Sequence, residues 1–437
     1  MPLPSGPQPP SRLTEQYPAR PRRVVVTGVG AISPLGGDAA QTWAGLLGGR
    51  SGIRQLTAPE FDGLPVRVAA PSAVEPAELL PRPQARTMSR AAQFAVLAAR
   101  EAWADAGLPA SAARDGLVDA RRLGVSIGTI LGGAPLLLTA DQALHEHGAR
   151  RVSPHSTPMM MPSGAAAQIA IDLGARAEAR TVVSGCASGA EAIGQAIDRI
   201  RTGHADLVIA GGTEAVIIPA ILASFSAMRA LSAVAAGPEH ASRPFDRDRD
   251  GFVLGEGAGL LVLEAEEHAL ARGARIYCEA AGWGLSVDAH HMVAPRADAE
   301  GVVDAIHRAL ADAGAKPDQV AHVNAHATAT PAGDATEVTA LCRVFGSEVD
   351  RIPVTAPKGA LGHLQGAAGG VEAVATVLTL RHGLIPPTVG FSQPDDGNPL
   401  DIVAGKPRPL PRSGDLALSN SYGFGGHNAV VAFRRCT

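Results

Sequence analysis

Short runs of β-branched and aliphatic residues alternate with alanine-rich segments of helical periodicity along most of this 437-residue chain. The apolar runs lie at 123–130, 180–185, 205–212, 259–265, 320–326, 352–357, 415–421 and 428–435. Between them, segments such as 89–107 and 299–315 repeat apolar residues at three- and four-residue steps. This alternation predicts βαβ units, and hence an α/β fold whose largely parallel sheet is covered on both faces. The element order is similar before and after about residue 270, which raises the hypothesis of an internal duplication.

Composition excludes several other classes of protein. Aromatic residues make up only 3%, so the core must be built from Ala, Val, Ile and Leu, and the net charge of -4 argues against a nucleic-acid binder. Four cysteines, at 186, 278, 342 and 436, form no CxxC pair, which favours a reducing cytoplasm over a disulfide framework or zinc site. No apolar run approaches the roughly 18–20 residues of a membrane span. Residues 1–21 are rich in proline, and we expect a disordered tail there.

Two stretches resemble ligand-binding motifs, one for a dinucleotide and one for calcium, but each departs from its motif. Gly28-Val29-Gly30 follows a buried strand, but Ser33 occupies the third glycine position of a dinucleotide fingerprint, so we expect a tight strand-to-helix turn. The stretch from Asp246 resembles a calcium loop, yet its twelfth position is Gly257. We therefore expect neither a cofactor nor a metal ion.

Cys186 stands between small residues in "TVVSGCASGAEAIG" (181–194), where a strand gives way to a helix. At a helix N-terminus the free N–H groups and the positive dipole end favour thiolate and lower its pKa. An inert buried thiol is the ordinary alternative, since free cysteines are usually buried. The choice between the two depends on a partner elsewhere in the chain.

Candidate partners follow in the C-terminal half. His326 ends a strand in "VNAHATATPAGD", and Lys358 precedes His363 in the glycine-rich "APKGALGHLQGAAGG", which leads into a helix with Glu372. Each histidine alone is more often structural than catalytic, but two in such loops favour a site. In "SNSYGFGGHN" the backbone N–H at Phe424 is a further candidate oxyanion donor.

Five ordered motifs, at 184–194, 242–259, 323–334, 356–369 and 420–428, together resemble the β-ketoacyl-acyl carrier protein synthases of the type I/II group, within the thiolase superfamily. The chain-elongating mycobacterial enzymes look the most similar. The resemblance implies a duplicated thiolase-like fold, a five-layer αβαβα arrangement in which two mixed sheets sandwich buried helices. We expect the nucleophile in an N-terminal half, 22–270, and both histidines in a C-terminal half, 271–437.

The resemblance also implies roles for individual residues. Cys186 would carry the acyl group, and His326 and His363 would bind the malonyl thioester and stabilise the enolate left by decarboxylation. Lys358 and Glu372 would fix charge and histidine orientation, and the N–H groups of Cys186 and Phe424 would hold the other oxyanion. Residues implied in binding the pantetheine arm or the acyl chain are Thr328, Thr330, Phe225, Phe424, Ser156, Leu131 and the methionines at 159–161. Relatives sometimes hold a monovalent cation near Asn324, Glu372 and Asn420.

The implied partner is an acidic acyl carrier protein, so a basic patch is expected near the site. Candidates are Arg82, Arg86, Arg90, Arg150, Arg151 and Arg229. A homodimer is also implied. Three alternatives stay open: a type II polyketide ketosynthase subunit, a thiolase, and a non-catalytic chain-length-factor-like partner. Thiolases carry a second reactive cysteine where this chain reads "GFGGHN", and chain-length factors lack the nucleophile, so both fit less well.

Overall fold

One plan of five strands occurs twice in the computed structural model, which describes residues 22–233 and 237–436. The first copy has the spatial order β1 (Val24–Ile32), β8 (Gly257–Ala265), β6 (Leu207–Glu214), β4 (Leu123–Gly128) and β5 (Glu178–Val182). The second has the order β9 (Cys278–Val287), β16 (His427–Arg435), β15 (Leu416–Gly423), β10 (Val320–Asn324) and β11 (Pro353–Thr355), with the short β13 (Asp401–Ile402) beyond it. In both copies the first two pairings are antiparallel and the next two are parallel. The predicted duplication is therefore confirmed.

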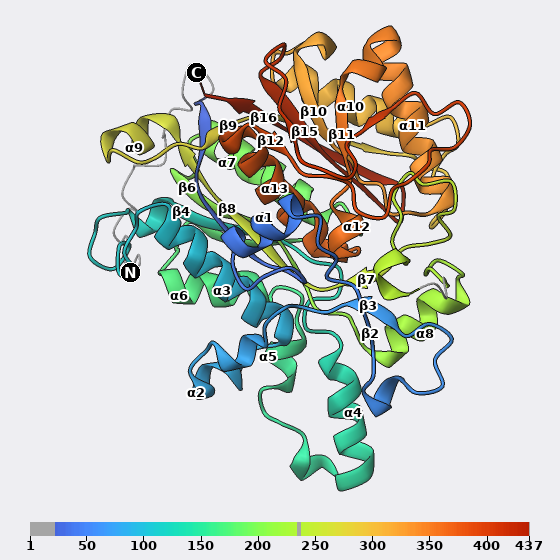
Figure 1. The fold of residues 1–437 in the computed structure, drawn as a ribbon. Coiled ribbons are helices and arrows are strands. Elements are labelled where there is room, and N and C mark those ends of the chain that lie inside the picture. The colour runs from blue at the N-terminus through green and yellow to red at the C-terminus, as the bar shows by residue number, and fades with distance from the viewer. Residues whose placement is uncertain (1–21, 234–236, 437) are drawn as a thin grey trace, which may run out of the picture.

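The two copies meet edge to edge. Strand β1 pairs with β9 through Val25–Glu279 and Val26–Cys278, so hydrogen bonds join both mixed sheets into one eleven-stranded sheet within the described residues. In Figure 1 the blue and green N-terminal copy and the orange and red C-terminal copy lie on opposite sides of the central helices.

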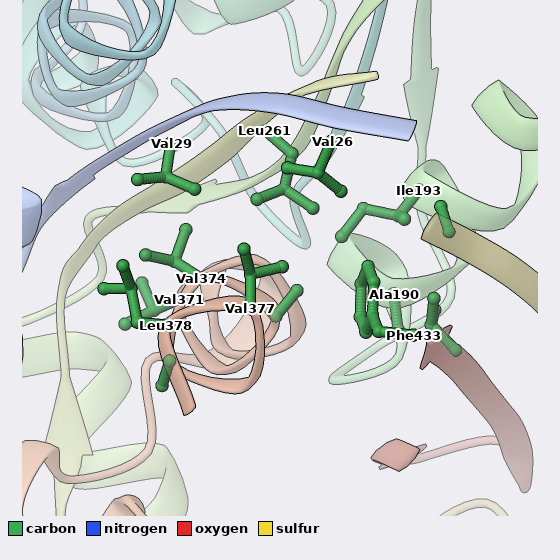
Figure 2. Close-up of a cluster of buried hydrophobic side chains, with 14 of the residues drawn as sticks. Val26, Val29, Ala190, Ile193, Leu261, Val371, Val374, Val377, Leu378 and Phe433 are labelled. Carbon is green, nitrogen blue, oxygen red and sulfur yellow. The ribbon is translucent and has the colours of Figure 1, made fainter. Parts of the chain in front are cut away.

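Two helices lie between the sheets. Helix α7 (Ser188–Arg201) contacts β4 and β6 of the first copy and β9 and β16 of the second, and α13 (Ala368–His382) contacts β6, β8, β15 and β16. Every residue of α13 from Ala368 to Leu380 is buried, as expected for a helix that is covered on all sides. Figure 2 shows Val374 and Val377 of α13 facing Val26 and Val29 of β1, with Ile193 of α7 nearby.

Outer helices complete the five layers. Helices α3 (Arg90–Asp105) and α6 (Gly164–Leu173) cover the first copy, and α10 (Glu300–Asp312) and α11 (Pro331–Phe345) cover the second. The predicted αβαβα arrangement is thus confirmed. The other helices are α1 (Ala39–Leu47), α2 (Arg82–Ala85), α4 (Leu136–His147), α5 (Ser156–Met160), α8 (Pro219–Ala227), α9 (Glu266–Ala271) and α12 (Lys358–Leu361). Small strands are β2 (Arg54–Gln55), β3 (Val68–Ala70), β7 (Leu254–Gly255), β12 (Leu384–Ile385) and β14 (Arg408–Pro409). Among the described residues no helix is both long and apolar enough to span a membrane.

The expected turn after Gly28 is wrong. Strand β1 continues past Gly28 to Ile32, with a register shift between Val26 and Gly28 in its pairing with β8, and α1 starts only at Ala39. The glycines are needed because α3 packs directly on the strand: a Cβ at Gly30 would lie 2.1 Å from the carbonyl oxygen of Ala98. Gly28 and Gly30 therefore indicate close packing of α3 on β1.

The sequence pattern also missed β9. Its residues, CEAAGWGLSV, include two glycines and two alanines and so lack the β-branched enrichment of the other strands. Helix α10 lies against it so closely that a Cβ at Gly284 would come within 2.1 Å of the Ala305 carbonyl oxygen. The small residues that permit this packing also remove the β-branched pattern by which a strand is recognised in a sequence. The predicted tail, 1–21, lies outside the described residues.

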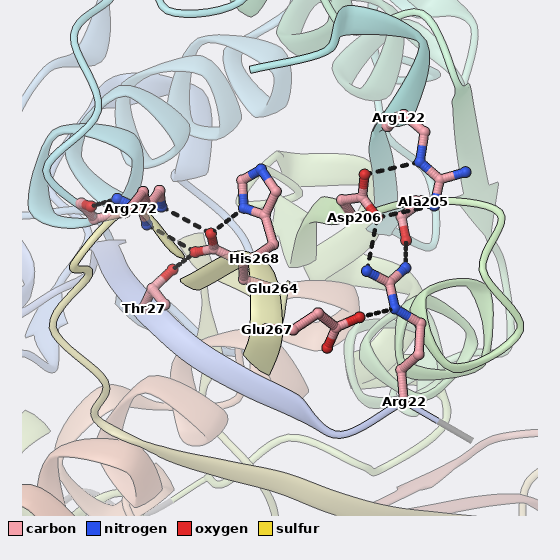
Figure 3. Close-up of polar contacts among 10 residues, drawn as sticks. Arg22, Thr27, Arg122, Ala205, Asp206, Glu264, Glu267, His268 and Arg272 are labelled. Carbon is pink, nitrogen blue, oxygen red and sulfur yellow. Dashed lines mark hydrogen bonds and ion pairs between the residues drawn. The ribbon is translucent and has the colours of Figure 1, made fainter. Parts of the chain in front are cut away.

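A buried carboxylate, Glu264, lies near the C-terminal end of β8. Glu264 accepts hydrogen bonds from Thr27 Oγ1 (2.9 Å), His268 Nδ1 (2.5 Å) and the Arg272 guanidinium (2.7 Å), as Figure 3 shows. Burial opposes its ionisation, but these bonds outweigh burial and lower the pKa of Glu264. This cluster ties β1, β8 and α9 together.

Candidate active site

Cys186 lies in the tight turn between β5 and α7, as predicted. Gly185, at φ 60°, reverses the chain, and α7 starts two residues after the cysteine. The hairpin of β15 and β16 packs on this turn, since a Cβ at Gly185 would lie 3.0 Å from the Phe424 carbonyl oxygen. The thiol is 6% exposed.

The structure brings both predicted histidines to this cysteine. His326 follows β10, and His363 follows α12 in the loop before α13. His363 Nε2 lies 2.9 Å from Cys186 Sγ, and the two imidazole rings are 5.4 Å apart at an interplanar angle of 86°. All three side chains line one cavity of about 380 Å³.

One hydrogen bond defines the tautomer of His363. The backbone N–H of Gln365 donates to His363 Nδ1 (3.3 Å), so the ring proton lies on Nε2 and points at the sulfur. Burial, with the nearby Lys358 charge, holds the pKa values of His326 and His363 well below the usual range. Both rings are therefore neutral hydrogen-bond donors at physiological pH.

The expected lowering of the Cys186 pKa is wrong for the resting site. Burial raises the pKa of Cys186 to about 12, and it outweighs the opposing effects of Lys358 and of the N–H groups of Phe424 and Cys186. Enclosure removes the water that would solvate a thiolate, and one helix end does not compensate. The resting sulfur is a protonated thiol, and it donates to Gln365 Oε1 at 3.7 Å.

Lys358 and Glu372 form an ion pair behind the histidines. The Nζ and Oε1 atoms are 2.5 Å apart, and the side chains are 1% and 2% exposed. Burial raises the pKa of Glu372 to about 7, against the opposing Lys358 charge. Neither residue lines the cavity. Lys358 therefore acts on the site through its positive charge, which adds to burial in lowering the pKa values of both histidines.

Three buried carboxylates that the sequence reading did not single out hold the loops of the site. Glu337 of α11 accepts the backbone N–H groups of His326 (3.0 Å) and Ala327 (2.7 Å). Asp334 accepts those of Phe245 (2.7 Å) and Ala329 (3.1 Å). Only Asp334 stood within a recognised motif.

Glu214 is the third of these carboxylates, at the end of β6. It accepts the N–H groups of Ile130 (2.6 Å), Leu131 (3.3 Å) and Gly132 (3.2 Å) in the first copy and of Gly366 (3.3 Å) in the second. It thus joins the loop after β4 to the loop that carries His363. The sequence feature that could have identified Glu214 is an acidic residue at the end of an apolar strand, in "GGTEA".

The expected substrate contacts divide into two groups. Thr328, Thr330, Phe225, Phe424 and Arg229 line the cavity. Ser156, Leu131, Arg150 and Arg151 do not line it: Ser156 begins α5, and Leu131 packs in the cluster beside Phe225.

The remaining arginines also differ from one another. Arg82, Arg86, Arg150, Arg151 and Arg229 are exposed, whereas Arg90 is bound by Glu75 and Glu256. Because two carboxylates offset its charge, we expect Arg90 to contribute less to docking than the exposed arginines.

No group of three or more His, Cys, Asp or Glu side chains in the described parts of the chain could hold a metal ion. Three buried oxygens near the ion pair nevertheless have no hydrogen-bond partner within residues 22–233 and 237–436: Asn324 Oδ1, Glu372 Oε2 and Asn420 Oδ1. Unpaired oxygens of this kind fit a monovalent cation. Such an ion would offset the charge of Glu372.

Comparison with known proteins agrees with this geometry. Residues 21–269 match the β-ketoacyl synthase N-terminal domain and residues 277–392 the C-terminal domain. A 3-oxoacyl-[acyl-carrier-protein] synthase 2 of Synechocystis is 43% identical over 95% of this chain and 98% of its own, and one of Staphylococcus aureus is 42% identical over the same shares.

Solved structures show the same likeness. A type II polyketide ketosynthase, solved in complex with its acyl-carrier protein and bound to the hexaketide, superimposes with a TM-score of 0.88 at 32% identity, over 96% of this chain and all of that one. A β-ketoacyl synthase of Burkholderia phymatum gives 0.85 at 36% identity, over 95% of this chain and all of its own. Fold and site thus define a thiolase-like acyltransferase. The chain belongs to the β-ketoacyl synthase family.

Proposed function

We propose that the protein is a β-ketoacyl-acyl carrier protein synthase that elongates acyl chains by decarboxylative Claisen condensation. The observation that carries the proposal is the thiol of Cys186, faced by the Nε2–H of His363 and by His326 in one cavity. The names of the relatives, 3-oxoacyl-[acyl-carrier-protein] synthases, support the same reaction.

The first half-reaction transfers an acyl group to the cysteine. Cys186 Sγ attacks the thioester carbon of the acyl carrier, the bond to the pantetheine sulfur breaks, and the thiol proton goes to that leaving sulfur. The backbone N–H groups of Cys186 and Phe424 stabilise the oxyanion. His363 Nε2–H supports the negative charge that develops on sulfur during the attack.

The second half-reaction forms the carbon–carbon bond. The malonyl thioester carbonyl oxygen accepts hydrogen bonds from His326 and His363, and loss of carbon dioxide leaves an enolate on that oxygen. The enolate carbon attacks the acyl carbon, the bond to Cys186 breaks, and the released thiolate takes up a proton from water. Neutral imidazoles suit this role, because each has one N–H that donates a hydrogen bond and is not readily deprotonated.

The partner in both steps is an acyl carrier protein. A relative's structure includes such a carrier, and Thr328, Thr330 and Arg229 line the cavity of this chain. The exposed Arg150 and Arg151 would add positive charge for an acidic carrier. The four free cysteines fit a reducing cytoplasm.

A second copy of the chain would complete the assembly as a homodimer. Strand β5 lies at the edge of its sheet, where its backbone is free to pair. The single chain also exposes Ile171 of the adjacent α6 and Val183 directly after β5. Sedimentation at micromolar concentration would show a dimer, and Val183→Lys would weaken it.

The test is intact mass spectrometry after incubation with acyl-carrier proteins of increasing chain length. Wild-type protein should gain one acyl mass, Cys186→Ala none, and malonyl-carrier protein should then discharge the adduct as a product two carbons longer. An adduct that persists on Cys186→Ala would contradict the proposal. Fatty-acid and polyketide elongation share this chemistry, and the preferred acyl group separates them.

A further inference from the structure

We propose that Gln365 makes this enzyme selective for acyl groups that carry an oxygen on their third carbon, as 3-oxo and 3-hydroxyacyl thioesters do. The inference rests on the proposed function, and it adds a substrate class. It starts from a polar side chain placed beside the nucleophile.

The Gln365 carboxamide is buried against the reacting sulfur. The residue is 3% exposed, it lines the cavity, and its Oε1 lies 3.7 Å from Cys186 Sγ. Its Nε2 has no hydrogen-bond partner among the residues that the structure describes. A buried amide N–H without an acceptor is costly, so its presence in an active-site cavity calls for an acceptor that arrives with the substrate.

Part of the cavity wall is apolar. The cavity wall near the sulfur includes the aromatic rings of Phe225, Phe252 and Phe424. An apolar side chain of similar size at 365 would suit a saturated acyl chain in such a wall. The amide N–H of Gln365 instead suits an acyl chain that carries an oxygen as hydrogen-bond acceptor.

The backbone gives a second, independent indication. Gln365 has φ 53°, a left-handed conformation that costs a residue with a side chain more than it costs glycine. Its own N–H fixes the tautomer of His363, and Gly366 directly after it binds Glu214. The loop therefore holds the carboxamide in place beside the sulfur.

The position of the substrate oxygen follows from the chemistry. On acylated Cys186 the first acyl carbon carries the thioester oxygen, which the N–H groups of Cys186 and Phe424 accommodate. A chain built in two-carbon steps carries its next oxygen on the third carbon, as a ketone or, after reduction, a hydroxyl. Acylation also removes the S–H that Oε1 accepts, so the amide is released for the chain. Nε2 is attached to the same carbon as Oε1, which keeps it within reach of that third carbon.

The experiment compares acylation of Cys186 by N-acetylcysteamine thioesters of hexanoate, 3-oxohexanoate, 3-hydroxyhexanoate and 4-oxohexanoate, followed by intact mass. The variants are Gln365→Leu and Gln365→Met, and Gln195→Leu, on α7 outside the cavity, is the matched control. Ratios between wild type and variant cancel the intrinsic reactivity of each thioester. A folding defect lowers all four rates alike.

We expect Gln365→Leu to lower the rate with both 3-oxygenated thioesters about tenfold relative to its own hexanoyl rate, because one hydrogen bond is removed. The wild-type protein should be acylated by the 4-oxo thioester at about the same rate as by the hexanoyl thioester. This comparison uses no variant, so it does not depend on the folding of a variant. Equal losses for all thioesters, or an unchanged ratio, would overturn the assignment of Gln365 alone. Failure of every thioester to acylate Cys186 would overturn the proposed function itself.

Discussion

Replacing Glu337 with glutamine tests whether the loop of His326 is positioned by one buried carboxylate. Glu337 Oε1 accepts the His326 N–H at 3.0 Å and the Asn420 side-chain amide at 3.1 Å, while Oε2 accepts the Ala327 N–H at 2.7 Å. A glutamine has one acceptor oxygen, so in either orientation its NH₂ group faces a donor. At least one hydrogen bond to a buried charged group is lost, which costs about 2 kcal/mol.

The activation free energy of condensation should rise by the same amount, because the displaced loop carries His326. About 2 kcal/mol corresponds to roughly a 30-fold loss of rate. Acylation depends on Cys186 and His363, neither of which Glu337 binds, so we expect it to stay within about threefold. The assay measures the two half-reactions separately: acyl transfer by intact mass, and condensation by release of carbon dioxide from malonyl-carrier protein.

The control is Glu264→Gln, which removes an equally buried carboxylate whose partners, Thr27, His268 and Arg272, lie outside the cavity. It should lower the urea midpoint without separating the two half-reactions. If Glu337→Gln lowers acylation as much as condensation, or leaves condensation unchanged, then positioning of His326 by this carboxylate is refuted.

Four further changes test other parts of the structure. Lys358→Met leaves Glu372 buried without its cation and should cost about 3–5 kcal/mol in chemical denaturation; Lys358→Met with Glu372→Leu should recover stability but not condensation. Burial lowers the pKa of His322 to about 3 from 6.5, so its neutral form stabilises the fold fully above pH 6.5 and that contribution is lost as the pH falls toward 3; His322→Leu should therefore remove about 2 kcal/mol of the stability difference between pH 7 and pH 5, measured in urea. Gly284→Ala should cost about 2 kcal/mol or more, because its Cβ would overlap Ala305, whereas Gly273→Ala, with open space around it, meets only the strain of φ 67°. Arg151→Glu with Arg229→Glu should raise KM for carrier-bound substrate and spare small thioesters, and an equal effect on both would contradict a docking role.

The sequence predicts most of the architecture, and its failures have definite physical causes. Strands with β-branched runs, such as β6 and β8, are read correctly because both faces are buried and the apolar pattern is continuous. Strand β9 is missed because Gly282 and Gly284 serve the packing of α10. The pKa of Cys186 is misjudged because its position before a helix is visible in the sequence, whereas its burial is a property of the folded chain.

The site exists because the two buried helices, one from each copy of the plan, meet at their N-termini. Cys186 precedes α7, which follows β5, and His363 precedes α13, which follows β11 in the equivalent place. The helix ends touch through glycines: a Cβ at Gly189 would lie 2.8 Å from the Gly370 nitrogen, and one at Gly369 would lie 2.5 Å from the Ala190 nitrogen. This contact, closer than any side chain permits, sets the 2.9 Å separation of His363 Nε2 and Cys186 Sγ. Because the duplication places two equivalent helix ends face to face, neither half of the chain alone could bring a thiol and an imidazole together in this way.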